Sequence, residues 1–107
     1  MGRDRRRSDR RQSDRLAGPF DTLMRLRRSI GLKRQVAAVV ENLSGDGAFV
    51  RTTETINPGE QLFLLFRLSA TGHTGPNVAA RGLVVRSERQ SNGRVGIAVQ
   101  FSSHRFL

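Results

Sequence analysis

The chain has 107 residues, with 19 Lys and Arg against 9 Asp and Glu and no cysteine, so its formal net charge is +10 at pH 7. This length suits one small domain, and the lack of cysteine excludes disulfides, thiolate zinc sites and cysteine nucleophiles. The longest apolar run, Leu62 to Phe66, is too short to cross a bilayer, and the charged N-terminus lacks the apolar stretch of a secretory signal, so we expect a cytoplasmic protein without membrane insertion.

Basic residues are concentrated in the first third of the chain. Residues 1–34 hold 12 Lys or Arg and 4 Asp, whereas residues 35–107 hold 7 Lys or Arg and 5 acidic residues, so the net charge divides into +8 and +2. Residues 2–15 contain no apolar side chain that could offset the entropy of ordering the backbone. We predict a flexible basic arm over residues 1–15 that binds an anionic partner, and a folded domain over residues 16–107.

The segment from Gly18 to Lys33 fits two kinds of element. A helix would place Phe20, Leu23, Met24 and Ile30 on one face, whereas a strand would place Phe20, Thr22, Met24 and Leu26 on one face. We favour a strand, bounded by Gly18-Pro19 and Gly31.

Five clearer strands follow, because β-branched and apolar residues are concentrated in Gln35–Glu41, Ala48–Thr53, Gln61–Leu68, Val78–Ser87 and Arg94–Phe101. Between them, Asn57-Pro58-Gly59 predicts a tight turn, Ser69–Asn77 a longer loop and Ser91-Asn92-Gly93 a hairpin. In the last strand Val95, Ile97, Val99 and Phe101 should share the inner face. The less regular Gln61–Leu68 is typical of a strand covered on both sides.

Short connections between consecutive strands predict antiparallel pairing. An open sheet of this kind would expose unpaired edges, and closure removes them. We therefore predict an all-β fold, a small antiparallel β-barrel.

Two short motifs are candidate parts of a ligand site. Arg11-x-x-x-Arg15 offers guanidinium groups that can bind phosphate or the O6 and N7 edge of guanine and can stack on a purine. Asn42-x-Ser44-x-x-Gly47 offers an amide, a small hydroxyl and a glycine that permits unusual backbone geometry or close approach of a ligand. Taken alone, the first motif also fits a solvated basic tail and the second an Asx-type turn between strands.

In their order along the chain, these motifs and Val95-Gly96-Ile97-Ala98-Val99-Gln100-Phe101 resemble the PilZ domain. Leu16–Asp21 is also similar to a segment that follows the arginines in some members, and the resemblance covers residues 6–101. It implies a six-stranded antiparallel β-barrel, which agrees with the five clear strands and the ambiguous one. Many members continue into a C-terminal helix, and we expect little or none here because the chain stops soon after Phe101.

The resemblance also implies a ligand and a role. PilZ domains bind the bacterial second messenger cyclic di-GMP, and the matching residues here are Arg11, Arg15, Asn42, Ser44 and Gly47. Overlapping arginine spacings leave Arg6 and Arg10 as an alternative pair, with Arg7 as an additional candidate. Such receptors change conformation on binding nucleotide and act on a downstream protein partner, commonly in motility, adhesion or exopolysaccharide production.

The sequence offers little for catalysis or metal binding. His73 and His104 have no second ligand at metal-like spacing, Ser44 lies outside a G-x-S-x-G elbow, and there is no loop of the G-x-x-x-x-G-K-[S/T] type. We predict a binding protein that is not an enzyme and that uses no metal or cofactor.

Two other functions remain open from the residues alone. A small basic barrel could bind RNA or DNA nonspecifically, although the chain has no Tyr or Trp and no evident stacking platform among Phe49, Phe63 and Phe66. Alternatively, the arm could dock to anionic lipid or to an acidic protein surface while the barrel serves as a scaffold.

Overall fold

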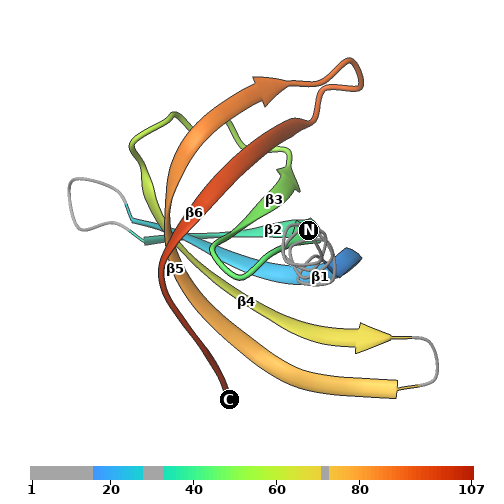
Figure 1. Ribbon diagram of the computed structural model, residues 1–107. Coiled ribbons are helices and arrows are strands. Elements are labelled where there is room, and N and C mark those ends of the chain that lie inside the picture. The colour runs from blue at the N-terminus through green and yellow to red at the C-terminus, as the bar shows by residue number, and fades with distance from the viewer. Residues whose placement is uncertain (1–15, 28–32, 71–72) are drawn as a thin grey trace, which may run out of the picture.

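The computed structural model describes residues 16–27, 33–70 and 73–107, which form six strands and no helix. The strands are β1 (Leu16–Arg27), β2 (Lys33–Leu43), β3 (Gly47–Thr52), β4 (Gln61–Ala70), β5 (His73–Arg89) and β6 (Val95–Phe106). All neighbours pair antiparallel, and the sheet closes in the order β1-β2-β3-β6-β5-β4 (Figure 1). The predicted six-stranded antiparallel β-barrel is confirmed, whereas the arm predicted over residues 1–15 lies outside the described residues.

The ambiguous N-terminal segment is a strand. From Phe20 to Arg27 its residues alternate strictly between buried and exposed, with Phe20, Thr22, Met24 and Leu26 inside the barrel. A helix would have turned Leu23 toward the core with Met24, but Leu23 is 49% exposed. β1 pairs with β2 along one edge and with β4 along the other, so cross-strand pairing decides between two periodicities that the sequence left open. Nowhere in the described ranges is there a helix that could span a membrane.

The loop predicted over Ser69–Asn77 is wrong, because most of it is strand. β4 runs to Ala70 and β5 begins at His73, and the two remain paired to these ends. An irregularity in register after Arg67 accommodates the extra length, and the Arg67 Nε donates a hydrogen bond of 3.1 Å to Asn77 Oδ1 across the pair. Gly75 and Pro76 lie at this bulge within β5, and the pairing with β4 continues past them.

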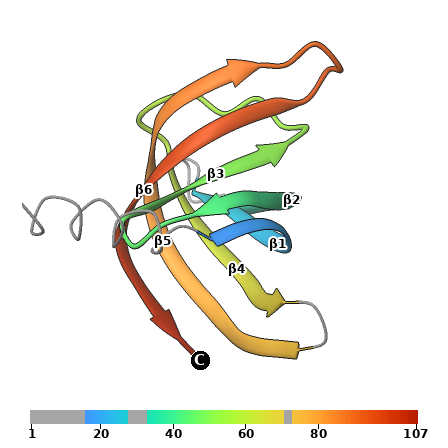
Figure 2. The same ribbon diagram turned by 45° about the vertical axis from the view of Figure 1, so that its right-hand side comes forward.

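β6 also extends past its predicted end at Phe101. Its last residues, through Phe106, pair with β5 but not with β3, whose pairing with β6 ends at Gln100. The two views agree that this end of β6 runs along β5 and away from β3 (Figures 1 and 2).

The two short turns are as predicted. At Asn57-Pro58-Gly59 the Glu60 N–H donates to the Asn57 carbonyl oxygen at 3.2 Å. At the β5–β6 hairpin the Gln90 N–H donates to the Arg94 carbonyl oxygen at 2.7 Å, and Gly93 has a φ of +80° that suits glycine.

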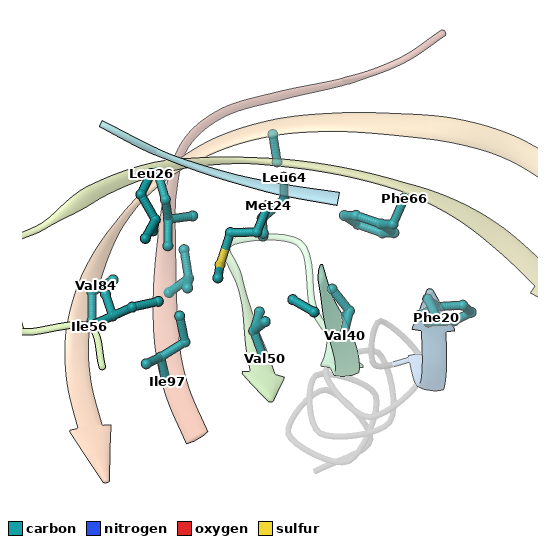
Figure 3. Close-up of a cluster of buried hydrophobic side chains, with 14 of the residues drawn as sticks. Phe20, Met24, Leu26, Val40, Val50, Ile56, Leu64, Phe66, Val84 and Ile97 are labelled. Atoms are coloured by element: carbon teal, nitrogen blue, oxygen red, sulfur yellow. The ribbon is translucent and has the colours of Figure 1, made fainter. Parts of the chain in front are cut away.

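The core fills the barrel (Figure 3). Phe20 and Phe66 stack with ring centroids 6.2 Å apart, and Ile56, from the β3–β4 connection, is fully buried beside Val84 at one end of the cluster (Figure 3). The inner face predicted for the last strand is confirmed, since its three aliphatic residues are buried and Phe101 packs against the cluster. The cover predicted on both sides of Gln61–Leu68 is wrong. Leu62, Leu64 and Phe66 are buried, but on the outer side Phe63 and Leu65 are only partly buried, and Gln61 and Arg67 are exposed.

Candidate functional site

The β2–β3 turn is held closed by Ser44. Its backbone N–H donates to the Gly47 carbonyl oxygen at 2.9 Å. Its hydroxyl lies 2.9 Å from Asp46 Oδ1 and 3.2 Å from the Gly47 carbonyl oxygen, and donates toward both. A turn between the two strands is present as predicted, but it is the hydroxyl of Ser44 that stabilises it, and not the Asn42 amide of an Asx-type turn.

A β-bulge at Glu41 turns Asn42 outward. Val40 is opposite Val50 in β3, but Asn42 is opposite the next residue, Phe49, so Glu41 is the extra residue on β2. Strict alternation after the buried Val40 would point Asn42 into the barrel. With the bulge, Asn42 is exposed and its neighbour packs against the core. Bulges commonly re-aim side chains beside functional sites.

An ion pair between neighbouring strands spans this bulge. Glu41 Oε1 and Arg51 Nη2 are 2.7 Å apart, in a contact that is close but not aligned as a hydrogen bond. The two side chains are 27% and 32% exposed, so the pair is partly shielded from water. It joins β2 to β3 just before Asn42.

Gly47 is needed for strand packing. A Cβ at this position would collide with the Val99 carbonyl oxygen of β6. Its φ is not positive, since the positive-φ glycines among the described residues are Gly59 and Gly93. The glycine therefore lets β3 and β6 approach each other at the edge of the turn, a reason that the sequence alone did not supply.

The turn opens onto a hollow of about 570 Å³ in the outer wall of the barrel. Its lining comes from the turn and from the outer sides of β3, β5 and β6, and includes Asn42, Ser44, Phe49, Arg86 and Ala98. A continuous lateral row of paired residues crosses it, in the order Ala17, Asn42, Phe49, Ala98, Arg86.

This row has a polar residue at each side of an apolar centre. Asn42 and Arg86 are three strand spacings apart, about 14 Å at about 4.8 Å per strand. Phe49 and Ala98 lie between them. A second bulge, at Val85, separates the buried Val84 from Arg86 and leaves both Val85 and Arg86 exposed. Among the described residues that line the hollow, Arg86 supplies the cationic group and Asp46 the carboxylate.

The same row brings the start of β1 to the site. Leu16 pairs with Leu43, and Ala17 pairs with Asn42. The chain therefore enters the barrel beside the motif that lies 26 residues further along the sequence.

The structure brings together Asn42, Ser44 and Gly47, as the sequence predicts. The predicted arginines, Arg6, Arg7, Arg10, Arg11 and Arg15, lie outside the described residues. Sequence reasoning missed Phe49, Val85 and Arg86 as site-lining residues. The local sequence contains no signal for them, because they reach the hollow through cross-strand register.

Other candidate groups do not converge at a site. His104 is exposed and its ring lies beside that of Phe101, with centroids 5.8 Å apart and the ring planes tilted by 46°. Within residues 16–27, 33–70 and 73–107 there is no cluster of three His, Cys, Asp or Glu side chains that could hold a metal ion. Phe66 is buried in the core, while Phe49 and Phe63 lie on β3 and β4, which are not neighbours in the barrel. These three rings form no common surface for stacking bases.

Residues 4–105 match the family model of the PilZ domain, so the chain belongs to the PilZ domain family. This is a family of cyclic di-GMP receptors and adaptors. Among solved structures, the chain is similar to the Bacillus subtilis inhibitor of motility, MotI/DgrA, with a TM-score of 0.65 and 18% sequence identity. The match covers 83% of this chain and 41% of that one, so the chain spans about two fifths of the length of that structure, and at this identity the likeness concerns the fold. No curated protein matches the chain.

Proposed function

We propose that this chain is a cyclic di-GMP receptor that acts in the cytoplasm on a downstream protein partner and is not itself an enzyme. The observation that carries the proposal is the pairing of Ala17 with Asn42, which brings the segment following the arginine motif to the edge of the Asn42–Gly47 turn. The Asn42–Gly47 turn therefore lies beside the start of β1, the strand that follows the arginine motif in the sequence. Membership of the PilZ family supplies the ligand.

The hollow beside the turn suits a nucleotide in size and chemistry. Its volume of about 570 Å³ falls within the range of ligand sites in proteins. Phe49, Val85 and Ala98 offer an apolar floor against which a purine can pack, and Arg86 offers a guanidinium to a phosphate or a guanine edge. Asn42 can donate to and accept from the polar edge of a base.

The remaining charge comes from the N-terminal arginines. We assign Arg11 and Arg15 as the pair that binds the nucleotide from the side of β1, with Arg6 and Arg10 as the alternative pair. Binding would order these residues against the hollow and change the charge presented there, which a partner protein can detect. Motility, adhesion or exopolysaccharide production are the outputs that the family suggests, and the name of the similar MotI/DgrA favours motility.

Isothermal titration of the full chain with cyclic di-GMP tests this proposal. We expect saturable binding, and we expect Arg11→Ala and Arg15→Ala each to weaken it by about ten- to a hundredfold, since a charge-assisted bond contributes about 1.5 to 3 kcal/mol. Arg94→Ala, in the exposed β5–β6 hairpin, is a control of equal charge change and should bind as the wild type does.

Three outcomes of the titration separate the alternatives. Absence of binding heat for the wild type would refute the receptor. An unchanged affinity in Arg11→Ala with a loss in Arg6→Ala would move the contact to the other pair. Equal affinity for GTP and for cyclic di-GMP would show general anion binding by a basic chain.

A further inference from the structure

The outer wall formed by β2, β1, β4 and β5 carries an apolar row where polar residues are expected. Ala37 pairs with Leu23, Leu23 with Leu65, and Leu65 with Ala79. Phe63 lies in the adjacent row on the same side of β4. We call these five residues the leucine face. In a small antiparallel barrel one side of each strand fills the core, and the other side normally meets water with polar side chains.

The leucine face lies outside the core and is partly exposed. Leu23 is 49% exposed, Ala37 is exposed, and the other three residues are partly buried. Leu62, Leu64 and Phe66, which alternate with Phe63 and Leu65, are the ones that fill the barrel. The apolar residues on the inner side of β4 are therefore explained by the core, whereas those on its outer side are not. A connected apolar surface across four strands is typical of a binding surface.

Arginines surround this face. Arg25 and Arg81 occupy the row of Phe63, on either side of it, and Arg105 follows Ala79 at the end of the leucine row. Arg25, Arg81 and Arg105 form no ion pair with a described carboxylate, since the ion pairs seen are Arg34–Glu54 and Arg51–Glu41. The neighbouring acidic group is Asp21, beyond Leu23 on β1. The margin of the leucine face is therefore positively charged.

We propose that the leucine face docks an acidic amphipathic segment of a partner protein. The proposal rests on the proposed function only for the existence of such a partner. Apolar side chains of the segment would pack on Leu23, Leu65 and Phe63, and its carboxylates would meet the surrounding arginines. The small side chains of Ala37 and Ala79 flank the two leucines and leave shallow depressions, into which side chains of a partner can fit.

Charge and shape disfavour the other occupants of this face. A second copy of the chain would bring the same arginines against their counterparts, and each copy carries a net charge of +10. Binding to a lipid surface requires apolar side chains that project from the protein and insert into the bilayer. Phe63 and Leu65 are partly buried against the wall, so they present a surface for a shaped partner and little to insert into a bilayer.

The leucine face is separate from the nucleotide hollow. The hollow lies over β3, β6 and the later part of β5, whereas Leu23, Phe63 and Leu65 lie on β1 and β4, at the other side of the closed strand order. Leu23, Phe63 and Leu65 do not line the hollow. Nucleotide and partner can therefore be bound at the same time, and substitutions in one site should leave the other intact.

The test uses the full chain and a synthetic helical peptide of about 18 residues, with Leu on one face and Glu on the other, and a scrambled peptide of equal composition. Anisotropy gives affinity, and backbone amide chemical shifts locate the contact. We expect tighter binding of the amphipathic peptide than of the scrambled one, with shifts centred on Leu23, Leu65 and Ala79. Leu23→Ser should weaken binding by about tenfold or more.

Matched variants separate the face from general effects of charge and apolarity. Leu16→Ser alters a leucine of the same strand that is 44% exposed, and should bind the peptide normally. Arg81→Glu should weaken binding, whereas Arg94→Glu, in the β5–β6 hairpin, should change it much less. Cyclic di-GMP titrated into Leu23→Ser should bind as it does to the wild type, so failure of the docking proposal and failure of the receptor proposal give different results.

Four results would overturn the proposal. Two concern the peptide: equal binding of the two peptides, and full peptide affinity in Leu23→Ser. The third is self-association of the chain in sedimentation that Leu23→Ser abolishes. The fourth is binding to vesicles of phosphatidylcholine and phosphatidylglycerol that Leu23→Ser abolishes, in a chain that does not bind the peptide at this face.

Discussion

Arg86 shows how much a single side chain can add to a site that motifs define only in part. It lies at the end of the row that begins beside Asn42, and a bulge at Val85 accompanies its exposure on the outer wall. The motif residues Ser44 and Gly47, by contrast, largely hold the turn and the approach of β6 in place. Ligand binding at this proposed site therefore depends also on groups outside the motif, such as the Arg86 guanidinium.

Arg86→Ala should weaken binding of cyclic di-GMP by about tenfold or more, because the hollow loses the cationic group that its described lining provides. Titration calorimetry measures the effect. Arg89→Ala is the matched control, since Arg89 is an exposed arginine of the same strand that does not line the hollow. Equal losses in the two variants would mean that only overall charge matters.

At the scale of elements, the bulge at Glu41 connects strand pairing to the site. The ion pair with Arg51 joins β2 and β3 just before Asn42 turns outward. Another ion pair, Arg34–Glu54 at 3.1 Å, connects β2 to the segment after β3 without touching the turn. The two pairs therefore allow a comparison between an ion pair that positions a site residue and one that does not.

Glu41→Gln should weaken nucleotide binding a few-fold and lower stability by about 0.5 kcal/mol, as is usual for a partly exposed ion pair. The direction of the change in affinity is informative, because loss of a negative charge near an anionic ligand would by itself strengthen binding. Weaker binding in Glu41→Gln, with no change in Glu54→Gln, would support a positioning role for Glu41. Stronger binding would show that Glu41 acts only through its charge. Calorimetry and urea unfolding supply the two measurements.

For the whole molecule, the barrel depends on a residue outside its strands. Ile56 lies in the β3–β4 connection, is fully buried, and covers one end of the core beside Val84 (Figure 3). The connection is tied to β5 by hydrogen bonds from the Gly59 N–H to the Val84 carbonyl oxygen, 2.8 Å, and from the Val84 N–H to the Glu60 carbonyl oxygen, 2.9 Å. The connection is thus part of the barrel.

Ile56→Ala should lower the free energy of unfolding by about 2 to 4 kcal/mol, through lost burial and the cavity left behind. Leu83→Ala is the control, because Leu83 is 39% exposed and should cost about 0.5 kcal/mol or less. Urea unfolding followed by circular dichroism measures both. A small effect in Ile56→Ala would mean that the connection can collapse into the space or that its tie to β5 does not matter for stability.

The architecture could be predicted because alternation and turn residues repeat along most of the chain. The start of β5 could not, because Gly75 and Pro76 indicate a break locally while pairing with β4 overrides them. The end of β6 could not either, because it depends on pairing with the start of β5, about 25 residues earlier in the chain. The site was predictable where a motif marks it, at Asn42, Ser44 and Gly47. Phe49 and Arg86 join it only through cross-strand register, which local sequence does not encode.

The start of β1 lies beside Asn42, and this determines how strongly the turn and the N-terminal arginines of the proposed site must each bind the nucleotide. Arg15 immediately precedes Leu16 in the sequence, and Leu16 pairs with Leu43 beside the turn. If Arg15 contacts a nucleotide in the hollow, as proposed, that second contact is intramolecular, at an effective concentration that short tethers bring to roughly millimolar. Under this proposal, the turn and the arginine each need to bind the nucleotide only weakly, because their covalent connection makes the combined binding tight.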